Sequence, residues 1–367
     1  MYCVRRKIHW QRRCRRCESE LPAQTGSRAS GCPLRRRATV CASSAVAPVA
    51  PPAADATVPV FAFSTSHFTR AQHIPGGTVD DKQHRRGGRA PSAQEQRSAG
   101  RRLEEAGIRA VWTNEVIGKD AFAHLAVLLA ATERMTAGTC VANIWARAPQ
   151  TAHGAAAYLA QAYRGRFVLG LGVGYPQQAD SVGREFGSPL TTMRDYLTGM
   201  NEQTWPPAPE ASYPRILAAN GPKMLALAAE IADGALPAAL PAEHTARARN
   251  TLGSGKLLVV GQSVVVDDDP GRARATAREV VRTWAARPSF RATLVELGYP
   301  ASEIDDTSDR VVDALVAHGS PESITATIRA QRDAGADHVV LLPPIGTEFA
   351  SGIEQLVSIA PALNEIG

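Results

Sequence analysis

A glycine-rich stretch at residues 166–178, RFVLGLGVGYPQQ, is the first segment that could bind a ligand. Its glycines stand at every second position: Gly170, Gly172 and Gly174. A dinucleotide fingerprint needs G-x-G-x-x-G at the opening of a helix, but Tyr175 occupies the third glycine position and Pro176 is expected to prevent an immediate helix. Alternate glycines on one face of a strand either let a flat ligand approach the backbone or fit a crowded interior. On the residues alone, both interpretations stay open.

Polar and aromatic residues also follow other apolar runs, where parallel strands would end. Trp112 and Glu115 close one run, and Trp145 and Arg147 close another. A guanidinium can form a bidentate pair with a carboxylate, which makes Arg147 a candidate for binding a carboxylate of a substrate or cofactor.

The segment AANGPK, residues 218–223, ends a further apolar run at the point where a helix is expected to begin. Backbone N–H groups around Asn220 and Gly221, a helix N-terminus and Lys223 would meet there. This combination predicts an anion site, and we expect a phosphate to bind it. The alternative is a plain turn with Pro222 at the first position of the helix.

The elements that must position these residues alternate between apolar strands and amphipathic helices. Strands are predicted at residues 58–66, 108–112, 135–145, 166–174, 215–219, 234–240, 257–266 and 338–342. Helices are predicted at residues 94–106, 120–132, 151–163, 189–200, 223–232, 242–252, 270–286, 321–334 and 352–363. This order predicts an α/β fold, a (β/α)8 TIM barrel, with a doubly wound sheet as the alternative. Residues 287–318 are expected to form a helical insertion over the barrel mouth, after the seventh strand.

The N-terminal part differs from the rest in composition. Residues 1–57 are expected to form a disordered basic, Cys-rich leader and an Ala/Pro linker, and residues 58–367 the barrel. Cys14 and Cys17 have the spacing of half a zinc site, but no second Cys/His pair follows, so no metal is predicted. A polar segment at 69–93 disturbs the first strand–helix unit, 58–93. We therefore expect that the sequence ahead of about Ser92 stems partly from a wrong start site or reading frame.

Composition and charge argue against two classes of partner. The net charge of +6 arises in residues 1–41, which hold ten Arg, one Lys and two Glu, so that the remainder carries −3. Such a body offers no basic surface to a phosphate backbone, so nucleic acid is not an expected partner. No apolar run approaches the roughly 18 residues of a membrane span. We expect a cytoplasmic protein that acts on a small molecule, with a homodimer as a candidate oligomeric state.

Several segments in order resemble the bacterial luciferase-like superfamily, and within it the branch that uses the deazaflavin coenzyme F420. They are LEEAGIRAVW…GKDAF, LLAATERMTAGTCVANIWARAPQT, GRFVLGLGVGYP, GSPLTTMRDYL, AANGPKMLALAAEIADGALP and AGADHVVL. The resemblance extends from about Gly100 to the C-terminus, about 270 residues. It implies an eight-stranded barrel with a flat tricyclic ring at the mouth and a phosphate tail on loops and helix starts.

The resemblance also implies roles for individual residues. A bulge in the third strand, with a non-prolyl cis peptide that supports the ring from behind, corresponds to Cys140–Val141. Residues expected around the cofactor are Thr139, Cys140, Val141, Asn143, Gly172, Gly174, Gln178, Asn220, Gly221 and Lys223. Those expected at the substrate are Trp112, Trp145 and Arg147. Glu115 and Tyr175 are the predicted catalytic residues, with Tyr175 as a proton donor to a reduced substrate.

One departure from the family limits the substrate. A His–Glu pair serves sugar-phosphate-oxidising relatives as base and acid, and Val116 and Tyr175 stand in its place, so a sugar phosphate is not expected. The resulting hypothesis is an oxidoreductase that transfers a hydride between coenzyme F420 and a small organic substrate. The alternatives are an FMN-dependent luciferase-like monooxygenase and a flavin- or deazaflavin-binding protein without catalysis.

Overall fold

The structure, a computed structural model, describes residues 91–116 and 118–366. The predicted leader, linker and first strand, and the polar segment up to residue 90, lie outside these residues. The domain boundaries inferred from the sequence therefore stay predictions.

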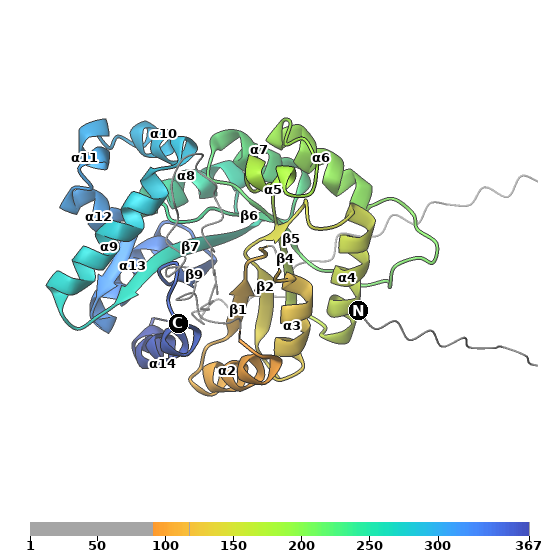
Figure 1. The fold of residues 1–367 in the computed structure, drawn as a ribbon, viewed down its shortest axis with the longest axis horizontal. Coiled ribbons are helices and arrows are strands. Elements are labelled where there is room, and N and C mark those ends of the chain that lie inside the picture. The colour runs from red at the N-terminus through yellow and green to blue at the C-terminus, as the bar shows by residue number, and fades with distance from the viewer. Residues whose placement is uncertain (1–90, 117, 367) are drawn as a thin grey trace, which may run out of the picture. The chain divides into compact units, whose positions relative to one another are not determined.

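The strands of the described residues form one parallel sheet. They are β1 (Ala110–Thr113), β2 (Thr136–Thr139), β3 (Ala142–Asn143), β4 (Phe167–Gly172), β5 (Arg215–Ala218), β6 (Gly234–Leu236), β7 (Leu257–Val266), β8 (Val316–Gly319) and β9 (His338–Leu342). The neighbour order is β1-β2-β4-β5-β6-β7-β8, with β3 beside β4 and β9 beside β7. All of these ladders are parallel. Parallel neighbours require crossover connections, and helices provide most of them (Figure 1).

Most helices lie where the spacing of apolar residues predicts them. They are α2 (Ala93–Glu105), α3 (Ala121–Leu129), α4 (Pro149–Ala162), α5 (Pro176–Asp180), α6 (Pro189–Met200), α7 (Pro222–Ile231), α8 (Ala242–Leu252), α9 (Pro270–Ala285), α10 (Pro288–Glu296), α11 (Ala301–Asp305), α12 (Asp309–Leu315), α13 (Pro321–Asp333) and α14 (Phe349–Asn364). Side-chain caps begin several of them. Ser92 forms a capping box with Glu95 at α2, and Asp120 accepts from the Ala123 N–H at α3.

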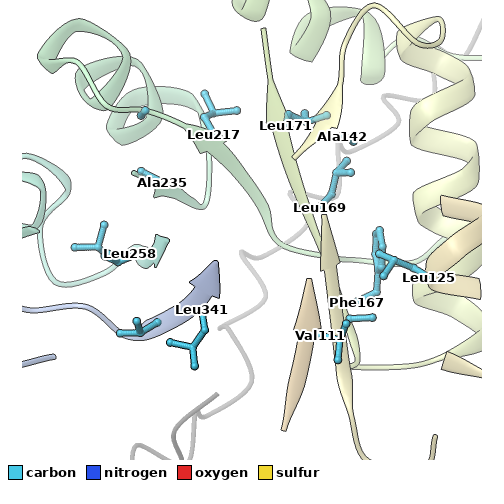
Figure 2. Close-up of a cluster of buried hydrophobic side chains, with 14 of the residues drawn as sticks. Val111, Leu125, Ala142, Phe167, Leu169, Leu171, Leu217, Ala235, Leu258 and Leu341 are labelled. Carbon is cyan, nitrogen blue, oxygen red and sulfur yellow. The ribbon is translucent and has the colours of Figure 1, made fainter. Parts of the chain in front are cut away.

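Side chains alternate along each strand between two buried clusters. The outer cluster packs strands against helices and includes Val111, Leu169, Leu217, Ala235, Leu258 and Leu341. Figure 2 labels these six residues together with other members of the cluster. The inner cluster contains the neighbouring residues Ala110, Trp112, Ile216, Leu236, Val259 and Val340. Strands β1, β5, β6, β7 and β9 can share this inner cluster only if the sheet curls around it. The (β/α)8 barrel predicted from the alternation is thus the observed architecture.

The edges of the curled sheet approach each other at β1 and β9. No ladder among the described residues joins these two strands, but Trp112 Nε1 donates a hydrogen bond to His338 Nε2 over 2.9 Å. Trp112 is 2% exposed and fills the barrel interior. The sequence places the first strand of the barrel at residues 58–66, outside the described part of the chain.

Three local predictions were wrong. The single strand expected at 135–145 is divided into β2 and β3 at the Cys140–Val141 bond, which is cis as the resemblance implied. Helix α5 begins directly at Pro176, because proline is tolerated at the first position of a helix. Residues 287–318 are helical through α10, α11 and α12, but their end is strand β8, which pairs with the second half of β7.

We predict that Gly138→Ala destabilises the barrel. A Cβ at this position would lie 2.3 Å from Cε3 of Trp112 and would overlap the indole ring, which neighbouring strands hold in place. Overpacking of this kind costs roughly 1–3 kcal/mol, measurable as a lower urea midpoint of unfolding. Gly154→Ala in α4 is the matched control, because its Cβ would meet no atom within 4 Å. Equal midpoints for the two variants would show that the Trp112 ring can move aside.

We predict that the protein loses stability as the pH falls below 6.5. Burial lowers the pKa of His338 to about 3, and burial together with the charge of Lys119 lowers the pKa of His124 to about 3. A histidine with a depressed folded-state pKa contributes its full stabilisation above the unfolded value of about 6.5 and loses it as the pH drops towards 3. In His338→Gln the slope of unfolding free energy against pH between 6 and 4 should decrease by up to about 1.4 kcal/mol per pH unit. An unchanged slope would refute this assignment.

Candidate functional site

A cavity of about 390 Å³ opens beside the carboxyl ends of β1, β3 and β4. Its walls include Glu115, Lys119, Asp120, Asn143, Trp145, Arg147 and Gln178. Active sites of parallel barrels lie at this end because the loops after the strands converge there. The size is within the usual range for small-ligand pockets. Of the predicted site residues, the structure brings Glu115, Asn143, Trp145, Arg147 and Gln178 together at this cavity.

Glu115 is the most densely bonded residue of the cavity wall. Its carboxylate accepts hydrogen bonds from the backbone N–H groups of Ala121 (3.1 Å) and Asn143 (2.9 Å) and a two-pronged pair from Arg147. The backbone N–H of Glu115 donates to Val141 O over 3.1 Å. Glu115 is 6% exposed, and a carboxylate that deep needs such partners. Its position supports a structural role in place of the predicted catalytic one.

Arg147 is committed to the protein's own carboxylates. Besides Glu115, it donates to Asp120 Oδ2 over 2.8 Å, and its guanidinium lies 4.5 Å from the Phe122 ring centroid. Burial lowers the pKa of Arg147, but hydrogen bonds and charges from Glu115 and Asp120 outweigh this effect, so its pKa is raised. The sequence predicted that Arg147 binds a carboxylate of a ligand. In the structure Arg147 bonds two internal carboxylates, and its contact with a ligand stays a prediction.

Lys119 is a cavity residue that the sequence analysis missed. It ends a tight turn after β1, and its Nζ donates to Asn114 Oδ1 over 3.0 Å. Burial lowers the pKa of the Lys119 amine to about 8, against the raising effects of Glu115 and Cys140. Burial raises the pKa of the Cys140 thiol to about 12. A lysine six residues after the end of a strand is a weak signal, because surface turns carry lysines equally often.

The alternating glycines accommodate the β2–β3 bulge. A Cβ at Gly170 would lie 2.1 Å from Thr139 O, and one at Gly172 would lie 2.3 Å from Val141 Cγ2. Thr139 Oγ1 also donates to Gly170 O over 2.6 Å and accepts from Gly170 N. Thr139 is fully buried, so its predicted contact with a cofactor is not supported. The crowded-interior interpretation accounts for Gly170 and Gly172, and Val141 fills the space that was expected to receive a flat ring.

The end of β4 still borders the cavity. Gly172 pairs with Asn143, which lines the cavity. Gly174 has φ +66°, and a Cβ there would lie 1.8 Å from Gln178 Oε1, which accepts a hydrogen bond from the Tyr175 N–H. A glycine is therefore required at the turn that aims Gln178 of α5 at the cavity.

The aromatic residues are distributed differently from the prediction. Trp145 lines the cavity and donates from Nε1 to Val173 O over 2.7 Å. Trp112 lies inside the barrel, so its predicted contact with a substrate is not supported. Tyr175 is 38% exposed, and the guanidinium of Arg287 lies 5.4 Å from its ring centroid. Since Tyr175 does not line the cavity, the structure gives no support to it as a proton donor there.

The anion site predicted after β5 has open donors. Helix α7 begins at Pro222, and its N-cap Gly221 has no side chain to bond the first N–H groups. A Cβ at Gly221 would meet nothing within 4 Å, so the helix start is accessible. Lys223 in the first turn is exposed. Unbonded N–H groups, the helix dipole and an exposed amine suit a phosphate.

Asn220 joins two strand ends through its side chain, and its contact with a cofactor stays a prediction. Its side chain bonds both the N–H and the carbonyl of Ala238, and thereby joins the ends of β5 and β6. The carbonyl of Asn220 lies 2.8 Å from Nε2 of His244, which is 4% exposed. His244 Nδ1 is buried without a hydrogen-bond partner. Burial lowers the pKa of His244, so this ring is neutral at pH 7.

Two kinds of feature are absent from the described residues. No group of three or more His, Cys, Asp or Glu side chains is placed to hold a metal ion within residues 91–116 and 118–366. Among the helices of the same residues, none is long and apolar enough to cross a membrane.

A family model described as luciferase-like monooxygenase matches residues 67–338. A protein of Mycobacterium tuberculosis named as a coenzyme F420-dependent oxidoreductase is 34% identical over 166 residues, 36% of this chain and 48% of that protein. The chain thus matches about half the length of this relative. The 5,10-methylenetetrahydromethanopterin reductase of Archaeoglobus fulgidus is 24% identical over 298 residues, 68% of this chain and 90% of that protein.

Solved structures with the same fold include complexes with two different cofactors. An F420-dependent secondary alcohol dehydrogenase in complex with an F420–acetone adduct superposes with a TM-score of 0.61 at 16% identity, covering 84% of this chain and 99% of the other. The oxygenating constituent of 3,6-diketocamphane monooxygenase from Pseudomonas putida, in complex with FMN, gives 0.57 at 14% identity, covering 84% and 98%. The predicted family and barrel fold are thereby confirmed.

We predict that Glu115→Gln destabilises the protein by about 3 kcal/mol, because it leaves the buried side of the Arg147 guanidinium without its charge partner. Urea denaturation followed by circular dichroism measures the change. Glu230→Gln is the matched control, since Glu230 forms the same two-pronged pair with Arg194 on the surface, where side chains are 58% and 46% exposed. Surface pairs contribute little, so its midpoint should stay at the wild-type value. Equal effects of both substitutions would contradict the structural role of Glu115.

Proposed function

Since the chain belongs to the luciferase-like monooxygenase family, we propose that it is an oxidoreductase that uses coenzyme F420 to exchange a hydride with a small organic substrate. The observation that carries the proposal is the combination, on one barrel mouth, of a cavity beside β1, β3 and β4 and an open helix start after β5. The Mycobacterium tuberculosis relative and the secondary alcohol dehydrogenase, which are both named as F420-dependent, point to the same cofactor.

The residues at the mouth fit a flat ring with a phosphorylated tail. Cys140 and Val141 on the bulge, with Asn143 and Gln178 at the cavity, would hold the ring. The N–H groups that follow Gly221, and the amine of Lys223, would hold the phosphate. Val141 and the backbone of β3 lie between the cavity and the start of α7, beside Gly172. A Cβ added at Gly172 would be 3.6 Å from the Cβ of Ala218, at the end of β5. The two places are therefore connected along adjacent strand ends.

The cofactor supplies the redox chemistry when bound, because the deazaflavin ring accepts or donates a hydride. The protein contributes position and electrostatics. Trp145 and the Glu115–Arg147 pair form a rigid wall, because each is anchored by hydrogen bonds to strand ends. Rigid walls of this kind hold reacting groups in a fixed geometry, which reduces the entropy lost on reaching the transition state.

The second candidate is an FMN-dependent monooxygenase. The FMN complex of the diketocamphane enzyme, which shares this fold, favours it. Both cofactors carry a phosphate and a tricyclic ring, so the cavity and the start of α7 suit either one. Lys223 favours F420, because a cation at the phosphate site also attracts the acidic tail of this cofactor.

We predict that purified protein binds F420 more tightly than FMN. Each cofactor is titrated with protein, and the quenching of its fluorescence gives the dissociation constant. Tighter binding of FMN, with oxygen consumption in the presence of reduced FMN, would reverse the order of the two candidates. Binding without hydride transfer to any substrate of a broad panel would leave a non-catalytic binding protein.

Lys223→Met should weaken F420 binding about tenfold, which corresponds to about 1.4 kcal/mol for one charged contact at a helix start. Arg101→Met is the matched control, because Arg101 is an exposed cation of α2 outside the described cavity. If Lys223→Met and Arg101→Met have equal effects, the phosphate does not bind at α7.

A further inference from the structure

The cavity contains one amine whose role the family resemblance does not assign. We propose that Lys119 is the proton donor of this active site, and that its partner in the reaction is a small carbonyl compound or the corresponding alcohol. This inference rests on the proposed function and names a substrate class and a catalytic residue for it.

The position of Lys119 is set by the turn between β1 and α3. Its backbone N–H donates to Val116 O over 2.9 Å, and Gly118 has φ +85°, which a glycine adopts without strain. Nζ donates to Asn114 Oδ1 over 3.0 Å. Both Gly118 and Lys119 line the cavity.

The other acidic groups at the mouth are occupied elsewhere. Glu115 and Asp120 both accept hydrogen bonds from Arg147 and also cap the start of α3. His124 Nδ1 lies 2.9 Å from Thr113 Oγ1. Tyr175 stands outside the cavity wall beneath Arg287. Lys119 is thus the best-placed proton source among the described residues of the cavity.

The surroundings of Lys119 also suit proton transfer near neutral pH. The charged and titratable groups that face it are Glu115, Asp120, His124, Cys140 and Arg147. Burial lowers the pKa of Lys119 to about 8, while Glu115 and Cys140 act in the opposite direction. A general acid works best with a pKa close to the working pH, and lysines tuned by burial reach this range. At pH 7 the group is an ammonium ion that gives up its proton readily.

With a carbonyl substrate, the reaction is a two-electron reduction to an alcohol. A hydride from the reduced cofactor forms a C–H bond at the carbonyl carbon, and the π electrons of the C=O bond move to its oxygen. That oxygen takes a proton from the Lys119 ammonium and becomes a hydroxyl group. The substrate is reduced by two electrons, and the cofactor is oxidised by two and releases its ring N–H proton to water. The neutral amine takes a proton back from water, so the protons balance. In the reverse direction the neutral amine accepts the hydroxyl proton.

Competitive acetylation measures the amine without turnover. Intact protein is treated with a trace of acetic anhydride between pH 6 and 10, together with a lysine reference peptide, and the labelling of each lysine is quantified by mass spectrometry. The sequence has lysines at positions 7, 82, 119, 223 and 256, so peptides are readily distinguished. The labelling midpoint of Lys119 is expected near pH 8, against about 10.4 for the reference. A midpoint at the reference value would overturn the proposal.

Kinetics of variants complete the test. Wild type and variants are assayed with reduced F420 and a panel of short ketones and aldehydes, using the compound that is reduced fastest. Lys119→Met should bind F420 within twofold of wild type but lose kcat by a factor of about 100 or more. In wild type, kcat should decline above pH 8, and this decline should be absent in Lys119→Met. Lys119→Arg keeps the charge but holds its proton too tightly, so it should restore little activity.

Lys256→Met is the control variant, because the Lys256 amine donates to Ala232 O and does not line the cavity. Its kcat and pH profile should match those of wild type. Wild-type turnover together with an unchanged Lys119→Met variant would overturn the role of Lys119 alone. A wild type that binds F420 but reduces none of the carbonyl compounds would overturn the substrate class. A wild type that neither binds nor turns over F420 would overturn the proposed function as well.

Discussion

The carboxylate of Glu115 is the interaction on which the barrel mouth depends. It lies after β1 and bonds the N–H of Asn143 on β3, the start of α3 and the guanidinium of Arg147. Its own N–H binds Val141 O, so Glu115 holds the bulge between β2 and β3 from both sides. A buried carboxylate is tolerated only while such partners are present, which makes the three segments interdependent. Removing any partner would leave a desolvated charge.

A second constraint comes from the close contact between the bulge and β4. Gly170 and Gly172 lack side chains at the two places where Thr139 and Val141 cross the strand. The backbones therefore approach each other more closely than in an ordinary parallel pair. This contact brings Asn143 opposite Gly172 and places the end of β4 beside the cavity. The glycine row therefore shapes the site through the bulge.

Together, the two constraints explain how charge is distributed in the cavity. Arg147 is neutralised by Glu115 and Asp120, so ion pairs within the protein hold this wall of the cavity in place. Lys119 lies on the turn before α3, held by the neutral Asn114 amide. On the opposite rim, Arg287 at the start of α10 stacks between Tyr175 and Trp284 and connects the insertion to the end of β4. The mouth thus combines a fixed wall with groups suited to ligand chemistry.

The barrel could be predicted from the sequence because its signals are local. Apolar runs such as 257–266 show a strand buried on both faces, and caps such as Ser92 mark where helices begin. The short strand β8 was not predicted, because its four residues, Val316–Gly319, directly follow a helix and show no separate periodicity. They form a strand only because β7 extends past β9 and offers them a pairing edge. Pro176 was misjudged for a related reason, since its effect depends on whether the helix begins at that residue or before it.

By itself, the sequence determined the parallel α/β architecture, the strand ends that surround the mouth and the open start of α7, since each depends on residues adjacent in the chain. Only the tertiary structure decided which polar groups there remain available for a ligand. Arg147 and Glu115 are 32 positions apart, and the Asn220 side chain bonds a residue 18 positions away. Hydrogen-bond partners and burial depend on contacts between distant segments, and these determine whether a charged side chain supports the fold or contributes to the chemistry.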